Sequence, residues 1–256
     1  MYPYELFFGI TLYEVMIVLG FLAAILLFRR YSVRVGMSAK LYNLALVSVT
    51  AAAVGGYLSG YLFQGVYNWL GGEAFALNSG TGSTFLGGLL GGLAILAAVY
   101  FLGGRMVFRG SREPIDRFPE VMDGYAAGLA LGHGFGRIGC LMAGCCHGIA
   151  SEHGIYFPEL GHKALPTQLY EALFLFALAA FLWRIVTHTR GLGPAVYFTA
   201  YGIWRFFLEF LRGDDRGKTV IDFLTPSQLV SVLLVIAGIA LLIVKLRREG
   251  KHEDAR

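Results

Sequence analysis

The stretch Pro194-Ala-Val-Tyr-Phe-Thr-Ala-Tyr-Gly-Ile-Trp-Arg-Phe-Phe-Leu-Glu-Phe-Leu-Arg212 is apolar over the length of a membrane span, yet it contains Arg205, Glu209 and Arg212. Because their spacing is i, i+4 and i+7, these residues share one face of a continuous helix. An ion in the hydrocarbon costs about 3 kcal/mol or more, and chains accept that cost mainly where a helix bundle handles a polar ligand. The stretch therefore predicts a membrane helix with a charged face turned into the protein.

The composition of the whole chain is that of a polytopic membrane protein. Of its 256 residues, 56% are hydrophobic and 15% are charged, and the mean hydropathy is +0.62. These values exclude an ordinary soluble enzyme. No repeat or low-complexity linker divides the chain, so we expect one all-α membrane domain over residues 1–256. Seven stretches can cross about 30 Å of hydrocarbon, at about 10–28, 42–63, 85–103, 119–137, 166–186, 194–212 and 226–245.

Basic residues flank these stretches asymmetrically, which indicates an orientation. Lysine and arginine collect in cytoplasmic loops, so we place the N-terminus outside and the C-terminus in the cytoplasm. Of the 21 basic residues, 15 then lie inside, namely Arg29, Arg30, Arg34, Lys40, Arg105, Arg109, Arg112, Arg117, Arg184, Arg190, Lys245, Arg247, Arg248, Lys251 and Arg256. The net charge of +4 therefore reports topology, and nucleic-acid binding is not expected. Residues 1–9 contain no basic residue, so the first span is expected to remain as an anchor.

A second cationic motif, Gly136-Arg-Ile-Gly-Cys140, ends the fourth predicted span. Arg137 lies about 27 Å from the inner end of that span at 1.5 Å per residue, which places it near the outer boundary of the hydrocarbon. A snorkelling interfacial arginine is the ordinary alternative. Arg205 lies about 16 Å into its own span, near the midplane, where snorkelling is harder.

Glutamates on the same spans are the expected partners of the two arginines. Arg205 is predicted to pair with Glu209, and Glu171 with Arg137 or Arg205. Since Arg212 then leaves one positive charge in excess, an anion such as a lipid phosphate is expected, and the planar arginine fork suits phosphate. Three polar residues enter the bilayer together in the segment Leu165-Pro-Thr-Gln-Leu-Tyr-Glu-Ala-Leu173, and hydrogen bonding between helices is their alternative role. They are Gln168, Tyr170 and Glu171.

Small residues recur at helical spacing in three segments, which favours close helix packing in lipid. These segments are Gly55–Gly60, Gly87–Gly92 and Gly124–Gly128. Gly87 and Gly88 are also candidates for offering backbone N–H groups to an anion at a helix start.

All three cysteines lie in Cys140-Leu-Met-Ala-Gly-Cys-Cys-His147, which argues against a disulfide framework spread over outer loops. Three interpretations stay open: a metal site with His133 or His153, a local disulfide, and thiols that line a pocket. The spacing differs from a C-x-x-C zinc ribbon, so the metal site is the least favoured.

Together these motifs resemble the bacterial prolipoprotein diacylglyceryl transferase family over nearly the whole chain. The resemblance is carried by Tyr13 in the first span and by four segments: Phe85-Leu-Gly-Gly-Leu-Leu-Gly91, Gly136-Arg-Ile-Gly139 through Gly148, Pro166-Thr-Gln-Leu-Tyr-Glu171 and Tyr201-Gly-Ile-Trp-Arg-Phe-Phe-Leu-Glu-Phe-Leu-Arg212.

The resemblance implies an enzyme that moves the diacylglyceryl group of phosphatidylglycerol onto the lipobox cysteine of a preprolipoprotein and releases glycerol phosphate. Arg137 and Arg205 match the two essential arginines of the family, and they would bind the phosphate and stabilise the leaving group. Glu171 and Glu209 would hold the arginines in place, and Tyr13 matches a pocket tyrosine. The remaining candidates for substrate contact are Gly87, Gly88, Gly136, Gly139, Gln168, Tyr170 and Arg212.

The chain departs from the family pattern on the side expected to receive the acceptor. The family's His-Gly-Gly reads Leu86-Gly87-Gly88 here, and its Gly-Arg-x-Gly-Asn with a downstream glutamate reads Cys140 and Cys145. We therefore expect His133, His147 or Tyr13 to remove the proton, or else a paralogue with another acceptor.

The leading hypothesis is a multi-pass transferase of the bacterial inner membrane, with membrane lipids and a preprolipoprotein signal peptide as partners. Neither a cofactor nor a metal is expected. A lipid-dependent transferase with a different acceptor is one alternative, and a membrane thiol-redox or metal-binding protein built on Cys140, Cys145 and Cys146 is another.

Overall fold

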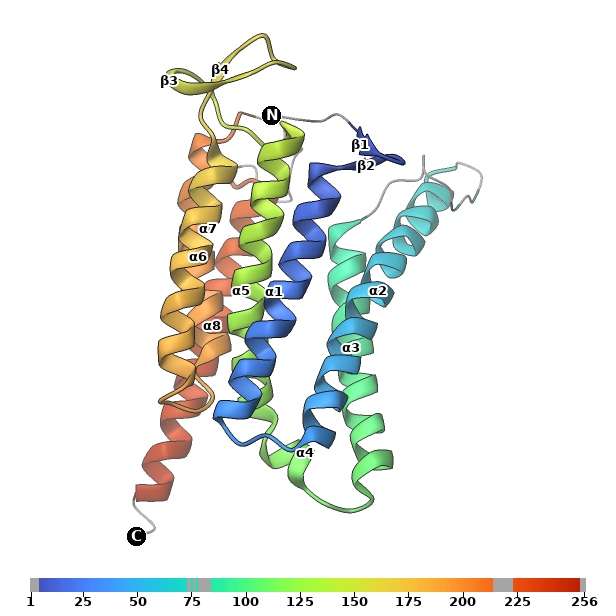
Figure 1. Cartoon of the computed structure of the whole chain (residues 1–256), viewed down its shortest axis with the longest axis vertical. Helices are drawn as coiled ribbons and strands as arrows, with labels where there is room; N and C mark the ends of the chain where they lie inside the picture. The colour runs from blue at the N-terminus through green and yellow to red at the C-terminus, as the bar shows by residue number, and fades with distance from the viewer. Residues whose placement is uncertain (1–4, 73–74, 76, 78–83, 214–222, 254–256) are drawn as a thin grey trace. The chain divides into compact units, whose positions relative to one another are not determined.

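The computed structural model describes residues 5–72, 75, 77, 84–213 and 223–253. This part of the chain is mostly helical (Figure 1). Its α-helices are α1 (Leu12–Arg34), α2 (Ala39–Leu70), α3 (Phe85–Phe108), α4 (Glu113–Asp116), α5 (Phe118–Ala143), α6 (Thr167–Val186), α7 (Gly193–Leu208) and α8 (Pro226–Glu253). Two small antiparallel hairpins join β1 (Glu5–Phe7) to β2 (Ile10–Thr11) and β3 (Ala150–Phe157) to β4 (His162–Ala164).

The helices divide into two compact units. One unit comprises Met1–Val35 and Pro119–Arg256, and the other comprises Gly36–Phe118. The first unit has a core in which leucines of α6 pack against alanines of α5 and tyrosines of α7. These core residues are Leu175, Leu178, Leu182, Ala126, Ala127, Ala130, Tyr197 and Tyr201.

Five helices in the described part of the chain are long and apolar enough to cross a membrane: α1, α2, most of α3, α6 and α8. The expectation of a polytopic, mainly helical membrane protein is therefore supported. The two further predicted spans correspond to α5 and α7, which are helical but do not meet the same criteria of length and composition.

The helix starts follow from local capping. Thr11 and Glu14 form a capping box at the start of α1, and the Ser38 side chain accepts the N–H of Leu41 at the start of α2. Pro166 is the N-cap of α6, and Pro194 lies in the first turn of α7.

Close helix packing at glycines occurs in both units, and Gly56 and Gly88 belong to the segments predicted for it. In the first unit, a Cβ added to Gly20 of α1 would lie 2.9 Å from the carbonyl oxygen of Gly132 in α5. In the second unit, a Cβ added to Gly56 of α2 would lie 2.9 Å from the carbonyl oxygen of Gly88 in α3. Only glycine allows backbones to approach this closely, as expected for helices packed in lipid.

Regular structure extends beyond the predicted spans in three places. The α5 helix continues past Arg137 to Ala143. The α2 helix continues past residue 63 to Leu70. The stretch between the fourth and fifth predicted spans contains the β3–β4 hairpin (Figure 1). In each case regular backbone hydrogen bonding extends into polar or glycine-rich sequence that hydrophobicity alone assigns to a loop.

Candidate functional site

The first part of the site is an ion pair between α5 and α6. Arg137 Nε lies 3.0 Å from Glu171 Oε2, and the Glu171 side chain is fully buried while that of Arg137 is 18% exposed. Breaking a buried pair by removing one partner leaves an uncompensated charge, so each group holds the other in place. Arg137 is thus the partner of Glu171, one of the two possibilities left open by the sequence.

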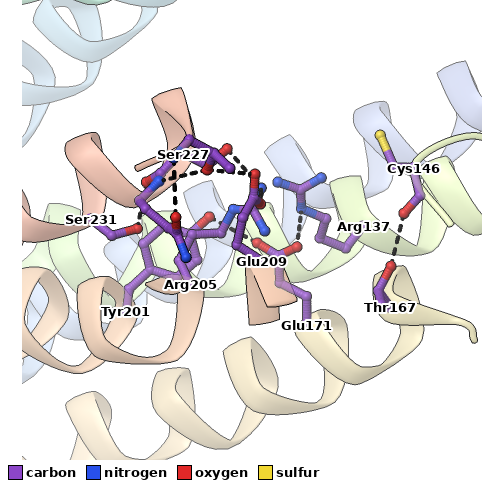
Figure 2. Close-up of polar contacts among 11 residues, drawn as sticks. Arg137, Cys146, Thr167, Glu171, Tyr201, Arg205, Glu209, Ser227 and Ser231 are labelled. Atoms are coloured by element: carbon purple, nitrogen blue, oxygen red, sulfur yellow. Dashed lines mark hydrogen bonds and ion pairs between the residues drawn. The ribbon is translucent and has the colours of Figure 1, made fainter. Parts of the chain in front are cut away.

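Tyr201 of α7 joins this pair to the next part of the site. Its hydroxyl donates a 2.8 Å hydrogen bond to Glu171 Oε1, so the carboxylate is contacted from two helices (Figure 2). The ring of His133 lies against the Tyr201 ring with centroids 5.0 Å apart, and His133 Nδ1 lies 3.2 Å from the Tyr197 hydroxyl. The predicted candidate base His133 is therefore held inside the helix bundle by two tyrosines.

The second ion pair lies one helical turn further along α7. Arg205 Nη2 is 2.7 Å from Glu209 Oε2, as predicted from their spacing, and the same nitrogen is 3.0 Å from the hydroxyl of Ser227. The Thr225 hydroxyl donates to Glu209 Oε1 at 2.9 Å. The other terminal nitrogen of Arg205, Nη1, is buried and has no hydrogen-bond partner in the described part of the chain. Figure 2 shows that both ion pairs belong to one polar cluster around Tyr201.

The prediction that Arg212 continues the charged face of the same helix was wrong. The α-helix ends at Leu208, residues Glu209–Leu211 form a 3-10 turn, and Arg212 is extended with φ −80° and ψ 141°. The backbone of Arg212 pairs with that of Gly148 in an isolated β-bridge, which requires an extended rather than a helical conformation at Arg212. The Arg212 side chain is still buried.

Beyond Arg137, α5 leads directly into the cysteine segment. The Sγ atoms of Cys140, Cys145 and Cys146 lie within 4.8 Å of one another, and all three are free thiols. The hydroxyl of Thr167 donates to the carbonyl of Cys146 at 2.9 Å, and the amide of Gln168 donates to the carbonyl of Cys145. Thr167 and Gln168, at the start of α6, therefore position the cysteine backbone, and Figure 2 shows the contact made by Thr167.

The three thiols also influence one another's ionisation. Hydrogen bonds from Cys140 and Cys145, together with the guanidinium of Arg212, lower the pKa of the Cys146 thiol. Hydrogen bonds to Cys140 and Cys146 raise the pKa of Cys145. The ionisation of each thiol therefore depends on that of its two neighbours.

The glycines predicted to contact substrate lie at helix contacts. A Cβ on Gly139 would lie 3.2 Å from the ring of Tyr13 in α1, and one on Gly136 would lie 3.7 Å from Ile17. In the second unit, a Cβ on Gly87 would overlap Phe63, while the N–H of Gly88 donates to the carbonyl of Thr84. Helix packing thus accounts for the space beside them.

The other predicted residues are placed as follows. Tyr13 is partly exposed and lies against Gly139. His147 Nδ1 lies 3.1 Å from the carbonyl oxygen of Gly148. Tyr170 is half-buried in the first turn of α6.

Sequence reasoning missed the polar residues that approach from α8 and the segment before it. Thr225 and Ser227 each donate or accept within the site, and Thr167 at the start of α6 was missed as well. The available signal was a cluster of small polar residues at the start of the last apolar stretch, which is also an ordinary helix-capping pattern.

The fold and the cluster define a helical membrane protein with a buried, arginine-rich polar site inside one helix bundle. The family model described as prolipoprotein diacylglyceryl transferase matches residues 4–244. The chain belongs to this family.

Relatives with this name match the chain over most of its length. It is 33% identical over 246 residues to phosphatidylglycerol--prolipoprotein diacylglyceryl transferase 2 of Clostridium perfringens, covering 91% of each chain. It is 32% identical over 245 residues to phosphatidylglycerol--prolipoprotein diacylglyceryl transferase of Clostridium tetani, covering 91% of this chain and 92% of the relative. The protein of that name from Geobacter sulfurreducens is 31% identical over 250 residues, with 93% and 91% covered.

Proposed function

We propose that this protein transfers the diacylglyceryl group of phosphatidylglycerol to the lipobox cysteine of preprolipoproteins. The observation that carries the proposal is the buried Nη1 of Arg205, whose hydrogen bond is not made within the described chain, beside two ion pairs. A buried guanidinium nitrogen without an acceptor costs about 1–3 kcal/mol or more. A phosphate oxygen is a suitable acceptor, and family membership supports that choice.

The hydrogen-bond donors of the site fit a phosphodiester. Arg137 and Arg205 are each paired with one carboxylate, of Glu171 and Glu209, and each guanidinium has further N–H donors. A phosphatidylglycerol phosphate carries one negative charge and offers oxygens that accept such hydrogen bonds. Glu171 and Glu209 orient the guanidinium groups, while Arg137 and Arg205 bind the phosphate.

The reaction then follows from the placement of charge. The acceptor sulfur attacks the glyceryl carbon that carries the phosphate, the carbon–oxygen bond breaks, and glycerol phosphate leaves with the electron pair. Negative charge grows on the leaving oxygen, and prepositioned guanidinium donors stabilise it in a site that excludes water. Gln168, Tyr170, Gly87, Gly88, Gly136 and Gly139 stay predicted substrate contacts, and His133, His147 and Tyr13 stay the predicted bases.

We further propose seven membrane spans in one domain over residues 1–256 of a bacterial inner-membrane protein, with the N-terminus outside. The α7 helix of 16 residues and the following 3-10 turn of 3 residues are together about 30 Å long. That length matches the hydrocarbon thickness. The flanking basic residues support the orientation.

The test is a reconstituted reaction of the purified protein with phosphatidylglycerol and a lipobox peptide. Mass spectrometry should detect a diacylglyceryl thioether on the peptide and an equal amount of glycerol phosphate. Arg137→Ala and Arg205→Ala should each abolish the product, whereas Arg184→Ala, on the exposed surface of α6, should retain it. Full activity in both site variants would refute the phosphate role.

A further inference from the structure

The three cysteines form a cluster that the phosphate site does not use. They are all the cysteines of the chain. Cys140 lies near the end of α5 and the other two lie in the turn that follows, and the three sulfur atoms converge. Zinc binds thiolates at about 2.3 Å, so the sulfurs of a tetrahedral site lie about 3.8 Å apart. Since the three Sγ atoms already lie within 4.8 Å of one another, small side-chain shifts of a few tenths of an ångström to about 1 Å bring them to that spacing.

The backbone that carries these thiols is fixed in an unusual conformation. Cys146 has φ +63°, which a non-glycine residue rarely adopts without support from its surroundings. That support comes from Thr167 and Gln168, which donate to the carbonyls of Cys146 and Cys145. The N–H of Cys145 also donates to the carbonyl of Cys140 at 3.2 Å, closing the turn onto α5.

The segment after the cysteines is held from two further sides. The N–H of Gly148 donates to the carbonyl of Leu165 at 2.7 Å, and the N–H of Ile149 donates to the carbonyl of Leu211 at 3.0 Å. A pocket-lining role for thiols does not require this degree of backbone fixation, whereas a metal site does, because its ligands must be held in place by outer contacts.

We propose that Cys140, Cys145 and Cys146 bind one thiophilic divalent cation such as Zn²⁺, and that its open fourth position takes the acceptor thiol. Within the described residues, the converging group contains these three ligands and no histidine. Three protein ligands with one open position is the arrangement of catalytic zinc, whereas structural zinc sites are closed by four. Cys145 is exposed and the other two cysteines are half-buried, so a peptide thiol has access.

The second half of this inference rests on the proposed transferase function. Arg137 precedes Cys140 by three residues on α5, so the two side chains share a helix face and lie about 4.5 Å apart along its axis. A thiol bound at the cluster would therefore lie about one helical turn beyond a guanidinium assigned to the phosphate. This distance suits a sulfur nucleophile and a phosphate leaving group on the same glyceryl carbon.

The metal would promote loss of the thiol proton without a separate base. A thiol that coordinates a metal ion is deprotonated, and its proton passes to water. The bound thiolate then forms the sulfur–carbon bond with its electron pair, and the carbon–oxygen bond to phosphate breaks. Glycerol phosphate leaves, and the neutral thioether binds the metal more weakly than a thiolate, which releases the product.

The metal site is tested by titrating the reduced protein, without an affinity tag, with Co²⁺. One Co²⁺ per chain with strong sulfur-to-cobalt charge-transfer absorption is expected, and excess Zn²⁺ should displace it. The affinity for Co²⁺ should fall by more than about tenfold in each of the variants Cys140→Ser, Cys145→Ser and Cys146→Ser. Even the loss of a hydrogen bond that orients a metal ligand lowers metal affinity by about 10–100-fold. His153→Ala and His162→Ala, on the adjacent hairpin, should not change it.

A reversible block of the thiols in the wild-type protein avoids the risk that a variant misfolds. Methylthiolation should abolish Co²⁺ binding, and reduction should restore it. Unchanged Co²⁺ binding in two of the three serine variants would overturn the site. The metal site would also be overturned if two of the cysteines form a disulfide in protein that is isolated without reductant after its free thiols are trapped at lysis.

The open position is tested by adding a lipobox peptide to the Co²⁺ form. The charge-transfer absorption should increase with the cysteine peptide and remain constant with its serine analogue, whether or not any lipid is present. An unchanged spectrum in a protein that still forms thioether overturns the acceptor role alone. A changed spectrum without thioether formation overturns the transferase instead. If His147→Ala alters the Co²⁺ spectrum before any peptide is added, the fourth position is already filled and the acceptor role is overturned.

Discussion

Replacing Glu171 by glutamine removes one charge from the centre of the site and changes little else. The amide has nearly the same volume, and its oxygen can still accept the hydrogen bond that Tyr201 donates at 2.8 Å. The Arg137 guanidinium, however, loses the carboxylate oxygen that lies 3.0 Å from its Nε. Any loss of stability then measures the ion pair rather than a cavity or an orphaned hydroxyl.

The expected loss is about 3 kcal/mol. Removing one partner of a buried ion pair costs about 3–5 kcal/mol. The lower end applies, because Arg137 is 18% exposed and water can compensate part of its charge. Arg137→Gln should cost at least as much, because Glu171 is fully buried and its charge would have no such compensation. The double variant Arg137→Gln/Glu171→Gln should lose less than the sum, by about 0.5–3 kcal/mol.

Reversible unfolding in mixed detergent micelles, followed by the fluorescence of the three tryptophans, measures these differences. Arg184→Gln is the control, because it removes an exposed arginine on the same helix as Glu171. The reasoning fails if Glu171→Gln costs less than about 1 kcal/mol and the effects of the two single variants simply add.

Three further outcomes are expected. Gly20→Ala should destabilise the protein by about 1–3 kcal/mol, because its Cβ would lie 2.9 Å from the Gly132 carbonyl. Gly136→Ala, with its nearest contact at 3.7 Å, should leave stability unchanged, and loss of transfer at unchanged stability would support Gly136 as a substrate contact. Asp123→Asn should lower the free energy of unfolding by about 1–3 kcal/mol in the same assay. Asp123 accepts the N–H groups of Gly191 and Gly193 at 2.5 and 2.6 Å, and an amide can accept only one of them. A loss of stability no larger than that of an exposed substitution would contradict this account. Ser227→Ala should lower the rate of diacylglyceryl transfer less than Arg205→Ala does in steady-state kinetics. The serine contacts only the Arg205 nitrogen that is already paired with Glu209. Equal losses of rate would show that Ser227 is needed to position the guanidinium.

The parts of this molecule that sequence could predict are those encoded by short-range spacing. Apolar runs gave the helices, and an i, i+4 spacing gave the Arg205–Glu209 pair, because both depend on one helix only. Repeated glycines predicted close helix contacts, because a neighbouring helix of any sequence can supply the partner. In each case the relevant partner lies within one or two turns, or any neighbouring helix can supply it.

What sequence could not predict depends on contacts between distant segments. The helix carrying Arg205 ends before Arg212 because Arg212 pairs with Gly148, 64 positions away. The α5 helix continues past Arg137, so the cysteines start on a helix and close onto a turn that α6 supports. A linear spacing of Cys-x4-Cys-Cys does not match known metal ribbons, and the convergence of its sulfurs appears only in the folded backbone.

Both site arginines already have a carboxylate, which at first argues against an anionic ligand. The geometry of the guanidinium removes the conflict. Arginine has five N–H donors, and one carboxylate oxygen occupies only part of them. In Arg205, Glu209 and Ser227 both contact Nη2 and leave Nη1 buried with its hydrogen bonds unmade in the described chain. The glutamate thus fixes the direction of the fork without using all its donors, which is the arrangement expected of a guanidinium prepared to bind phosphate.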